Sequence, residues 1–277
     1  MIPEDSNLDE VEFVIFDTET TGLEPVSGDR VVEIAGIRLK GKERVATFNS
    51  LVNPGRQISE AAFRVNKITP EMLKGAPAIG EVMPRFLKFI EGSCPCSYNA
   101  NFDVGFLNNE LKLVGQSEIK GVQFVDILKM ARKLMPGLER YALWFVADKL
   151  NIKVPQQHRA LSDVELTLGL FEKLTSMLRA KQIYDLNNFL ALFSIDQQIS
   201  QHLNNQKIAQ IQEAIDLGAK LNMRYLSSSN AEVSLREVIP REIKKDRDVS
   251  YLIGFCNLRH EERTFRIDNI LHLEIGS

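Results

Sequence analysis

The pattern of apolar positions in the first fifty residues predicts three strands. Residues 11–16 (VEFVIF) are apolar apart from Glu12, which is typical of a central strand buried on both faces. Residues 30–40 and 44–52 are rich in β-branched side chains and flank a turn at Gly41–Lys42. We therefore expect an antiparallel meander at the start of the chain.

Helical patterns follow in the middle of the chain. Residues 57–90 are expected to form short helices because they contain several helix-start signals, namely Ser59, Thr69–Pro70–Glu71 and Pro77. Residues 141–150 (YALWFVADKL) predict an amphipathic helix with Trp144 in the core.

The last seventy or so residues change character. Residues 207–220 predict a helix, and polar and apolar positions then alternate, which predicts a small, highly curved sheet or barrel. The expected strands are residues 221–226, 233–240, 250–257, 263–267 and 270–275.

The composition is that of a folded, soluble protein with one large domain or two smaller ones. The chain has 277 residues, of which 44% are hydrophobic and 26% charged. No apolar stretch reaches the roughly 18 residues needed to span a bilayer, and the acidic N-terminus lacks the pattern of a signal peptide. Three cysteines (Cys94, Cys96 and Cys256) make no even framework, so we expect reduced thiols in a cytoplasmic protein with no membrane partner. The net charge of −3 argues against strong, nonspecific binding to long nucleic-acid duplexes.

Two acids end the first strand. Asp17 and Glu19 are two positions apart, so they project from the same face and bring two carboxylates together. Like charges this close are unfavourable unless a cation lies between them, and oxygen ligands suit Mg²⁺ or Mn²⁺. The alternative is a strand that runs out into a solvated acidic turn, and the D-x-E pattern alone would favour it.

Two further acids lie where they can join this pair. Asp103 is at the head of a helical pattern, whose apolar face comprises Phe102, Phe106, Leu107, Leu111 and Val114. His158 lies in a polar loop five residues before Asp163. Ser162 and Glu165 form a capping-box pattern, so a helix is expected to begin there with Asp163 in its first turn, where the helix N-terminus stabilises an ionised carboxylate.

The order of these motifs resembles a known family. The segments DTETTGL, NANFD and HRALSD are similar to the three motifs of the DEDDh, or DnaQ-like, exonucleases, which include the proofreading subunit of bacterial DNA polymerase III and ribonuclease T. The resemblance covers roughly residues 12–178 and implies an α/β, ribonuclease H-like fold, a mixed central sheet flanked by helices, in a domain of residues 8–180. It also implies 3′→5′ hydrolysis of nucleic acid with two divalent ions, Mg²⁺ or Mn²⁺. Single-stranded DNA is the expected substrate and RNA the alternative.

The resemblance assigns roles to individual residues. Asp17, Glu19, Asp103 and Asp163 match the metal-binding acids, and His158 matches the general base. The residues implied to contact the substrate or support the site are Thr18, Thr20, Gly22, Leu23, Asn99 and Phe102.

The chemistry explains why these residue types are needed. Two metal ions about 3.5–4 Å apart can clamp the attacking and leaving oxygens of an in-line displacement at phosphorus. Four carboxylates offset the charge of both ions, and a histidine can take a proton from water near neutral pH.

The sequence departs from the family's usual pattern in two places. Asn66–Lys67 and Tyr98 stand where the family usually or often has a histidine, so the way in which substrate is held is left open. Residues 122–127 predict a strand whose acid, Asp126, we leave outside the site. Glu33 is expected to be a polar strand position rather than a metal ligand.

Residues 181–205 are expected to form a helical linker. The LALF segment, residues 190–193, resembles the end of the peptides with which bacterial replication proteins bind the sliding clamp, although Phe189 replaces the usual leading glutamine. A clamp or a polymerase is therefore a candidate partner. The favoured interpretation is an amphipathic connector that packs on a neighbouring domain.

Residues 206–277 resemble a second family. The segments AIDLGAKLNMRYLSSS, VSLREVIPREI and SYLIGFCNLRHEERTFRIDNILHLEI are similar to a WYL domain, although Ser250 replaces the first aromatic of the naming tripeptide. This implies an SH3-like β-barrel that binds nucleic acid or a nucleotide ligand. The implied ligand-binding residues are Arg236, Tyr251, Arg263 and Arg266. The alternative is that the arginines form surface ion pairs with Glu261, Glu262 and Asp268, because the segment contains eleven basic and eleven acidic residues.

Three functional hypotheses follow. The leading one is a metal-dependent 3′→5′ exonuclease, a phosphodiester hydrolase that binds nucleic acid with a free 3′ end, whose WYL domain binds nucleic acid or a nucleotide. The second is a catalytically silent nucleic-acid-binding or regulatory protein on the same fold, and the presence of all four acids and His158 weighs against it. The third is a polymerase-associated proofreading factor. The preference for DNA or RNA and for single or double strands, the WYL ligand, the oligomeric state and the pathway are left open.

Overall fold

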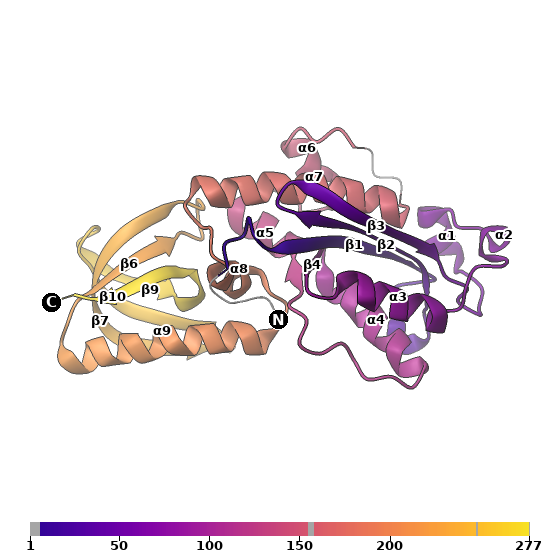
Figure 1. Cartoon of the computed structure of the whole chain (residues 1–277). Helices are drawn as coiled ribbons and strands as arrows, with labels where there is room; N and C mark the ends of the chain where they lie inside the picture. The colour runs from indigo at the N-terminus through magenta and orange to yellow at the C-terminus, as the bar shows by residue number, and fades with distance from the viewer. Residues whose placement is uncertain (1–5, 155–157, 248, 277) are drawn as a thin grey trace.

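The computed structural model describes residues 6–154, 158–247 and 249–276, which fold around two separate sheets (Figure 1). The first sheet has the strand order β3-β2-β1-β4-β5. Its strands are β1 (Glu12–Thr20), β2 (Val31–Lys40), β3 (Glu43–Leu51), β4 (Cys94–Ser97) and β5 (Val125–Asp126). The first three strands pair antiparallel, which confirms the predicted meander, and β4 and β5 add in parallel to give a mixed sheet.

Helices cover both faces of this sheet (Figure 1). The helices are α1 (Glu60–Asn66), α2 (Pro70–Leu73), α3 (Ile79–Ile90), α4 (Ala100–Leu113), α5 (Ile127–Leu134), α6 (Leu143–Lys149) and α7 (Ala160–Ala180). On β1, Phe13 and Ile15 pack on the side of α5 and α7, whereas Val14 and Phe16 pack on the side of α3 and α4. This burial on both faces is the physical reason for the unbroken apolar run in β1.

The start of α7 differs from the prediction. The helix begins at Ala160, two residues before Ser162, so the expected capping box does not define its N-terminus. Instead, the carboxylate of Glu33 on β2 accepts the N–H of Ala160 at 3.1 Å. The same carboxylate accepts two hydrogen bonds from the Arg159 guanidinium, at 3.0 and 2.8 Å. Asp163 still lies in the first turn, as predicted.

Two smaller elements also differ from the prediction. Only Val125–Asp126 of the strand expected at residues 122–127 joins the sheet, because Asp126 turns the chain and caps α5 by accepting the N–H of Leu128 at 2.8 Å. Helix α6 lies where it was expected, but its Trp144 is 51% exposed, so the placement of this ring in the core was wrong. The neighbouring Phe145 and Val146 occupy the buried face of α6 instead.

The segment that connects the two sheets forms two helices, and each packs against a different sheet. Helix α8 (Leu186–Phe193) packs into the first core, where the ring of Phe189 lies 5.6 Å from that of Phe13. Helix α9 (Gln197–Leu217) packs on the second sheet through Ile211 and Ala214. The LALF residues 190–193 are at most 7% exposed, so in this structure the clamp-like segment is a buried helix rather than an exposed peptide.

The second sheet has the strand order β10-β6-β7-β8-β9, with antiparallel pairing throughout. Its strands are β6 (Leu221–Leu226), β7 (Val233–Asp246), β8 (Val249–Cys256), β9 (Glu261–Arg266) and β10 (Ile270–Ile275), and a short 3₁₀ helix, η2 (Ile267–Asn269), joins the last two. Among the described residues no pairing joins β9 to β10, so the sheet is open and the closed barrel stays a prediction.

Two expectations from composition can be compared with the structure. Cys94, Cys96 and Cys256 are all buried with free thiols, as predicted. In the described part of the chain, no helix has the length and apolar character that crossing a membrane would require.

Candidate metal and catalytic site

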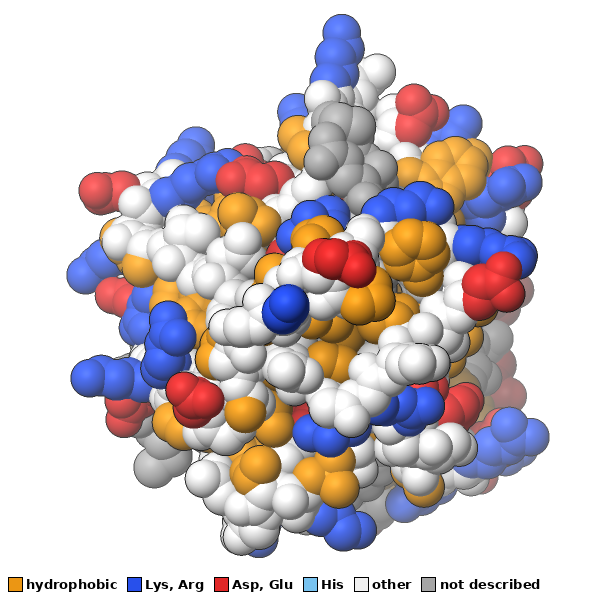
Figure 2. Space-filling view, turned by 90° about the vertical axis from the view of Figure 1, so that its right-hand side faces the viewer, with side chains coloured by type: hydrophobic (Ala, Val, Ile, Leu, Met, Phe, Trp, Pro, Cys, Tyr) orange, Lys and Arg blue, Asp and Glu red, His pale blue; other side chains and the backbone are white. Residues whose placement is uncertain are grey.

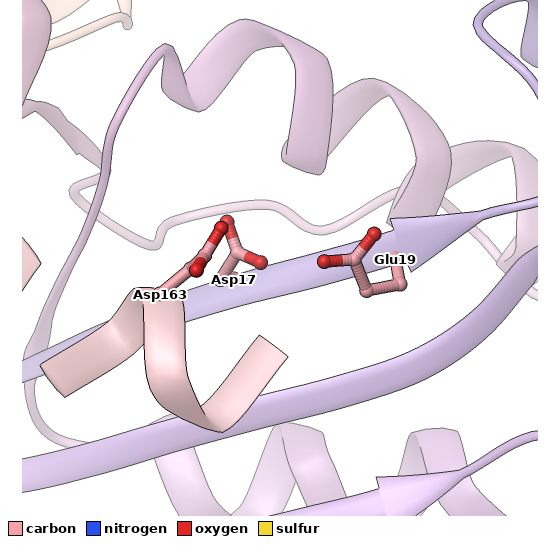
Figure 3. A group of neighbouring side chains, drawn as sticks. All are labelled: Asp17, Glu19 and Asp163. Atoms are coloured by element: carbon pink, nitrogen blue, oxygen red, sulfur yellow. The ribbon is translucent and has the colours of Figure 1, made fainter. Parts of the chain in front are cut away.

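Three acids meet near the C-terminal end of β1 (Figure 3). Asp17 and Glu19 project from the strand, and Asp163 reaches them from the first turn of α7. One carboxylate oxygen from each residue lies within 4.8 Å of the other two. Alternation along β1 places Asp17 and Glu19 on the same face as Phe13 and hence on the side of α7. Three oxygen donors at this spacing suit a hard divalent cation.

Asp103 reaches the strand from the other side. Its Oδ1 accepts the backbone N–H and the hydroxyl of Thr18, at 3.0 and 2.7 Å, and its Oδ2 accepts the hydroxyl of Ser97 at 2.5 Å. Because Thr18 alternates with Asp17, its side chain lies on the α4 side of β1. Asp103 is therefore not one of the three clustered acids. Its charge nevertheless raises the pKa of Asp17, and among the neighbouring charges its effect is the largest.

The carboxylates oppose one another's ionisation. Burial raises the pKa of Asp17 well above its usual range, and the nearby charges of Asp103 and Glu19 raise it further. Burial and then the charge of Asp163 raise the pKa of Glu19 to about 8. Burial raises the pKa of Asp103 to about 6, against the opposing effect of its hydroxyl hydrogen bonds. A divalent cation between these groups would relieve the repulsion.

His158 lies at the opening of the site, beside Asp163. Its backbone N–H donates to Asp163 Oδ1 at 3.2 Å, and its Nδ1 lies 3.9 Å from Oδ2. The side chain is 48% exposed, so water has access to the ring. The left-handed backbone of His158, with φ of 51°, turns the chain just before α7.

The turn after β1 is built by close contacts. The Thr20 hydroxyl donates to the Gly22 carbonyl at 2.5 Å, and a Cβ on Gly22 would overlap the carboxylate of Asp29, so a larger residue would displace that side chain. Asn66, which stands in place of the family's histidine, donates from its amide to the Thr20 carbonyl at 3.3 Å. Leu23 is 75% exposed at the tip of the turn.

The second motif fixes the start of α4. Asn99 adopts a left-handed φ of 69° and donates its backbone N–H to Asp126 at 3.1 Å. The Phe102 ring lies 4.9 Å from that of Phe106. Both residues therefore hold the turn of helix that carries Asp103.

Sequence reasoning missed two supporting contacts. Ser97 ends β4 and orients Asp103, whereas Glu33 and Arg159 together fix the loop that carries His158 and the start of α7. No local sequence pattern could predict the pairing of Glu33 with Arg159, because the two residues are 126 positions apart in the chain.

Apolar side chains are exposed beside this site. They are Leu23 and Val26 in the turn after β1, and Phe63 and Val65 on α1, with exposures of 75%, 93%, 39% and 48%. Figure 2 views the side of the molecule that carries α1 and α2, and hydrophobic side chains gather at its middle with charged ones around them.

Metal removal should make the stability of this protein depend on pH. The metal-free folded chain keeps a proton on Glu19 between pH values of about 4.5 and 8, where the unfolded chain has released it. The free energy of unfolding of the metal-free protein should therefore fall as the pH rises through this window, and Mg²⁺ should restore it most at pH 8. We expect changes in Tm of several degrees, since about 1 kcal/mol corresponds to about 2–4 °C in a chain of this size.

Thermal unfolding in EDTA and in Mg²⁺ at pH 5, 6.5 and 8 tests this expectation. In Glu19→Gln the fall in Tm with pH should be smaller and the gain from Mg²⁺ reduced. A Tm in EDTA that is the same at all three pH values, with no gain from Mg²⁺, would contradict it.

The structure brings together three of the four residues that were implied to bind a ligand in the second domain. Arg236, Arg263 and Arg266 line one surface depression of about 320 Å³, whereas Tyr251 on β8 is not part of its described lining. Two of the arginines also form the ion pairs of the alternative interpretation, Arg263 with Glu261 at 2.7 Å and Arg266 with Asp268 at 2.8 Å.

Comparison with known proteins agrees with this geometry. A family model described as exonuclease matches residues 14–171, and a model of the WYL domain matches residues 206–275. A DNA polymerase III PolC-type protein of Caldanaerobacter subterraneus subsp. tengcongensis is 36% identical over 190 residues, and a DNA polymerase III subunit epsilon-like protein of Rhodobacter capsulatus is 40% identical over 178 residues. These matches cover 68% and 63% of this chain but only 13% and 25% of the two relatives.

A solved structure resembles most of the chain. The structure of E. coli Exonuclease I in complex with a dT13 oligonucleotide has a TM-score of 0.58, with 14% sequence identity, and covers 96% of this chain and 66% of that one. At this level of identity the likeness concerns the fold, and it confirms the predicted α/β exonuclease architecture.

Proposed function

This chain belongs to the exonuclease family and carries a WYL domain, and from this we propose that it removes nucleotides from the 3′ end of nucleic acid by metal-dependent phosphodiester hydrolysis. The observation that carries the proposal is the meeting of Asp17, Glu19 and Asp163 within 4.8 Å, with His158 beside them. The oligonucleotide in the structurally similar Exonuclease I supports single-stranded DNA as the substrate class, with RNA as the alternative.

The donor set fits two divalent ions, Mg²⁺ or Mn²⁺. Asp17, Glu19 and Asp163 would hold them, and Asp103 has further oxygen lone pairs beyond those used by Thr18 and Ser97. The raised pKa values of Asp17 and Glu19 support this, since burial and neighbouring charges oppose ionisation of these carboxylates when no cation is bound. Bound ions would supply charge stabilisation at the phosphate and lower the pKa of the attacking water.

His158 is placed to handle the proton of that water. The imidazole lies at the mouth of the site and is half exposed, while Asp163 orients the backbone at the same residue. Proton removal by a positioned imidazole leaves a hydroxide in line with the terminal phosphodiester. The ion pair of Arg159 with Glu33 keeps this loop close to Asp163.

The turn after β1 is proposed to receive the terminal nucleotide. Thr20 and Gly22 shape the backbone, and Leu23 presents an apolar side chain to the last base. The exposed Phe63 on the neighbouring α1 extends this apolar surface. Because these contacts address the base and sugar rather than a long backbone, they are compatible with the net charge of −3.

The second domain is proposed to bind nucleic acid or a nucleotide. Its depression contains three arginines, Arg236, Arg263 and Arg266, and guanidinium groups bind phosphate through paired hydrogen bonds. The ion pairs of Arg263 and Arg266 with acids would have to be shared or exchanged when phosphate binds.

A time course on 5′-labelled strands tests the proposed activity. Purified full-length protein is incubated with Mg²⁺ or Mn²⁺ and single-stranded DNA or RNA of equal sequence. We expect a ladder that shortens from the 3′ end, no cleavage in EDTA, and no cleavage when the 3′ end is attached to a bead. The faster of the two strands identifies the preferred sugar.

The opposite outcome favours a different function. If calorimetry shows Mg²⁺ or Mn²⁺ binding but neither strand shortens, the chain is a regulatory or nucleic-acid-binding protein on an exonuclease fold. A proofreading role through a sliding clamp is not favoured by the structure, since residues 190–193 are buried in the first core.

A further inference from the structure

A cavity of about 420 Å³ lies where the two domains meet, and its described lining includes neither the three acids nor His158. Its walls come from three parts of the chain, namely α5 of the first domain, the α8–α9 connection and the second domain. Figure 1 shows α8, which borders this cavity, between the two sheets.

The wall of this cavity carries an excess of positive charge. Lys129, Arg132 and Lys133 are at spacings of three and four residues on α5, so they share one face, and Arg266 faces them from the second domain. Among the described lining residues, Asp268 is the one that carries a carboxylate. Asp268 already forms ion pairs with Arg266 at 2.8 Å and with Lys133 at 3.5 Å.

The remaining two cations, Lys129 and Arg132, form no ion pair with any carboxylate of the described residues. The Lys129 ammonium donates to the Ser194 carbonyl at 2.9 Å, and in the described parts of the chain no ion pair is formed by Arg132. Burial lowers the pKa of Lys133, and the charges of Arg266 and Lys129 lower it further against the opposing effect of Asp268. Cations gathered in a partly desolvated cavity are stabilised by an anion that several of them can share.

The rest of the lining fits an organic body with hydrogen-bonding groups. Ser200, Gln201 and Ser250 offer hydroxyl and amide groups, and Leu192 and Val249 offer apolar surface. Among the described residues, Asn204 in this lining has a buried Oδ1 with no hydrogen-bond partner. A buried acceptor without a donor is costly, so a ligand N–H or O–H would satisfy it.

We propose that this interdomain cavity binds a small phosphate monoester, with the phosphate on the α5 cations and Arg266 and a hydrogen-bond donor of its organic part on Asn204. A phosphate monoester carries close to two negative charges, which matches the unbalanced cations better than a carboxylate does. The volume is that of a single-nucleotide-sized molecule and lies in the usual range for small-ligand sites. The ligand would contact both domains and so stabilise their contact. The cavity shares Arg266 and Ser228 with the depression lined by Arg236 and Arg263, but the α5 cations and Asn204 line the cavity alone, and binding there does not depend on hydrolysis.

Calorimetric titration of the full-length, EDTA-treated protein tests this proposal. The probes are adenosine monophosphate, glucose 6-phosphate, inorganic phosphate and adenosine. We expect at least one monoester to bind more tightly than inorganic phosphate and adenosine and to raise Tm. The comparison of the first two probes distinguishes a nucleotide from a sugar phosphate as the organic part.

Substitutions locate the binding. Arg132→Gln should weaken monoester binding about tenfold or more, because a charged hydrogen bond is lost. Its side chain is exposed, forms no ion pair with the described residues and loses only a contact with the Tyr141 ring at 5.8 Å, so folding should be retained. Ser200→Phe, which fills the cavity from α9, should abolish binding. Lys112→Gln removes an exposed lysine from α4, outside the cavity, and should leave affinity unchanged.

Three results would overturn the proposal. The first is no binding of either monoester at millimolar concentration. The second is an affinity that is the same in the wild type and in the Arg132→Gln and Ser200→Phe variants. The third is loss of binding in Asp17→Asn, which would place the ligand among the acids. Absence of nuclease activity would refute the proposed function and leave this binding result unaffected.

Discussion

Replacing Asp17 by asparagine should lower the rate of 3′-end hydrolysis by about a thousandfold or more, because the metal site loses the carboxylate at its centre. The same change should raise the Tm of the metal-free protein. Burial and the charges of Asp103 and Glu19 raise the pKa of Asp17, so its ionised form destabilises the fold when no cation is bound. A loss of activity together with a higher Tm in this variant would show that Asp17 serves function at a cost to stability.

Two matched variants separate this effect from a general loss of structure. Glu12→Gln neutralises an acid on the same strand that pairs with Arg38 at 2.6 Å, outside the site, and should keep nearly full activity. Glu33→Gln weakens the buried contact with Arg159 and should lower Tm. Activity in Asp17→Asn within tenfold of the wild type would exclude Asp17 from a metal-dependent mechanism.

Replacing His158 by asparagine should lower kcat by about 10²–10⁴-fold while substrate binding is retained. The ring is exposed at the mouth of the site, and the backbone N–H, rather than the imidazole, makes the short contact with Asp163. The substitution therefore removes the proton acceptor and leaves the acids in place. Binding is measured by fluorescence anisotropy with a strand whose 3′-terminal linkage cannot be hydrolysed.

The control for this change is another histidine beside an acid. His272 on β10 lies 2.8 Å from Glu274 and is exposed, so His272→Asn should leave kcat unchanged. If His158→Asn keeps wild-type kcat, water loses its proton to some other group. If instead the affinity for the strand falls together with kcat, His158 positions substrate rather than accepting a proton.

Local patterns in the sequence determined the strand β1 and most of the chemistry placed on it. An apolar run predicts a strand buried on both faces, and the i, i+2 spacing places Asp17 and Glu19 on one face. The polar loop at His158 and the helical pattern after it placed the histidine just before α7 and Asp163 in its first turn, although the capping box expected at Ser162 does not define the start of the helix. These features depend on backbone periodicity, which operates over a few residues and is therefore readable from the sequence.

The tertiary structure decided which distant residues complete these patterns. Asp103 approaches β1 from the α4 side through Thr18 and Ser97, and the N-terminus of α7 is capped by Glu33 rather than by Ser162. Trp144 lies at the surface because other residues of α6 fill the core.

The same holds for the boundary between the domains. Helix α8 has the composition of a connector, yet Phe189 packs against Phe13 more than 170 residues earlier in the chain, and the cavity beside it draws its walls from three separate segments. The sequence by itself determined the family, the first strand and the candidate chemistry. The capping of α7, the approach of Asp103 and the interdomain cavity depend on contacts between residues far apart in the chain, for which periodicity carries no information.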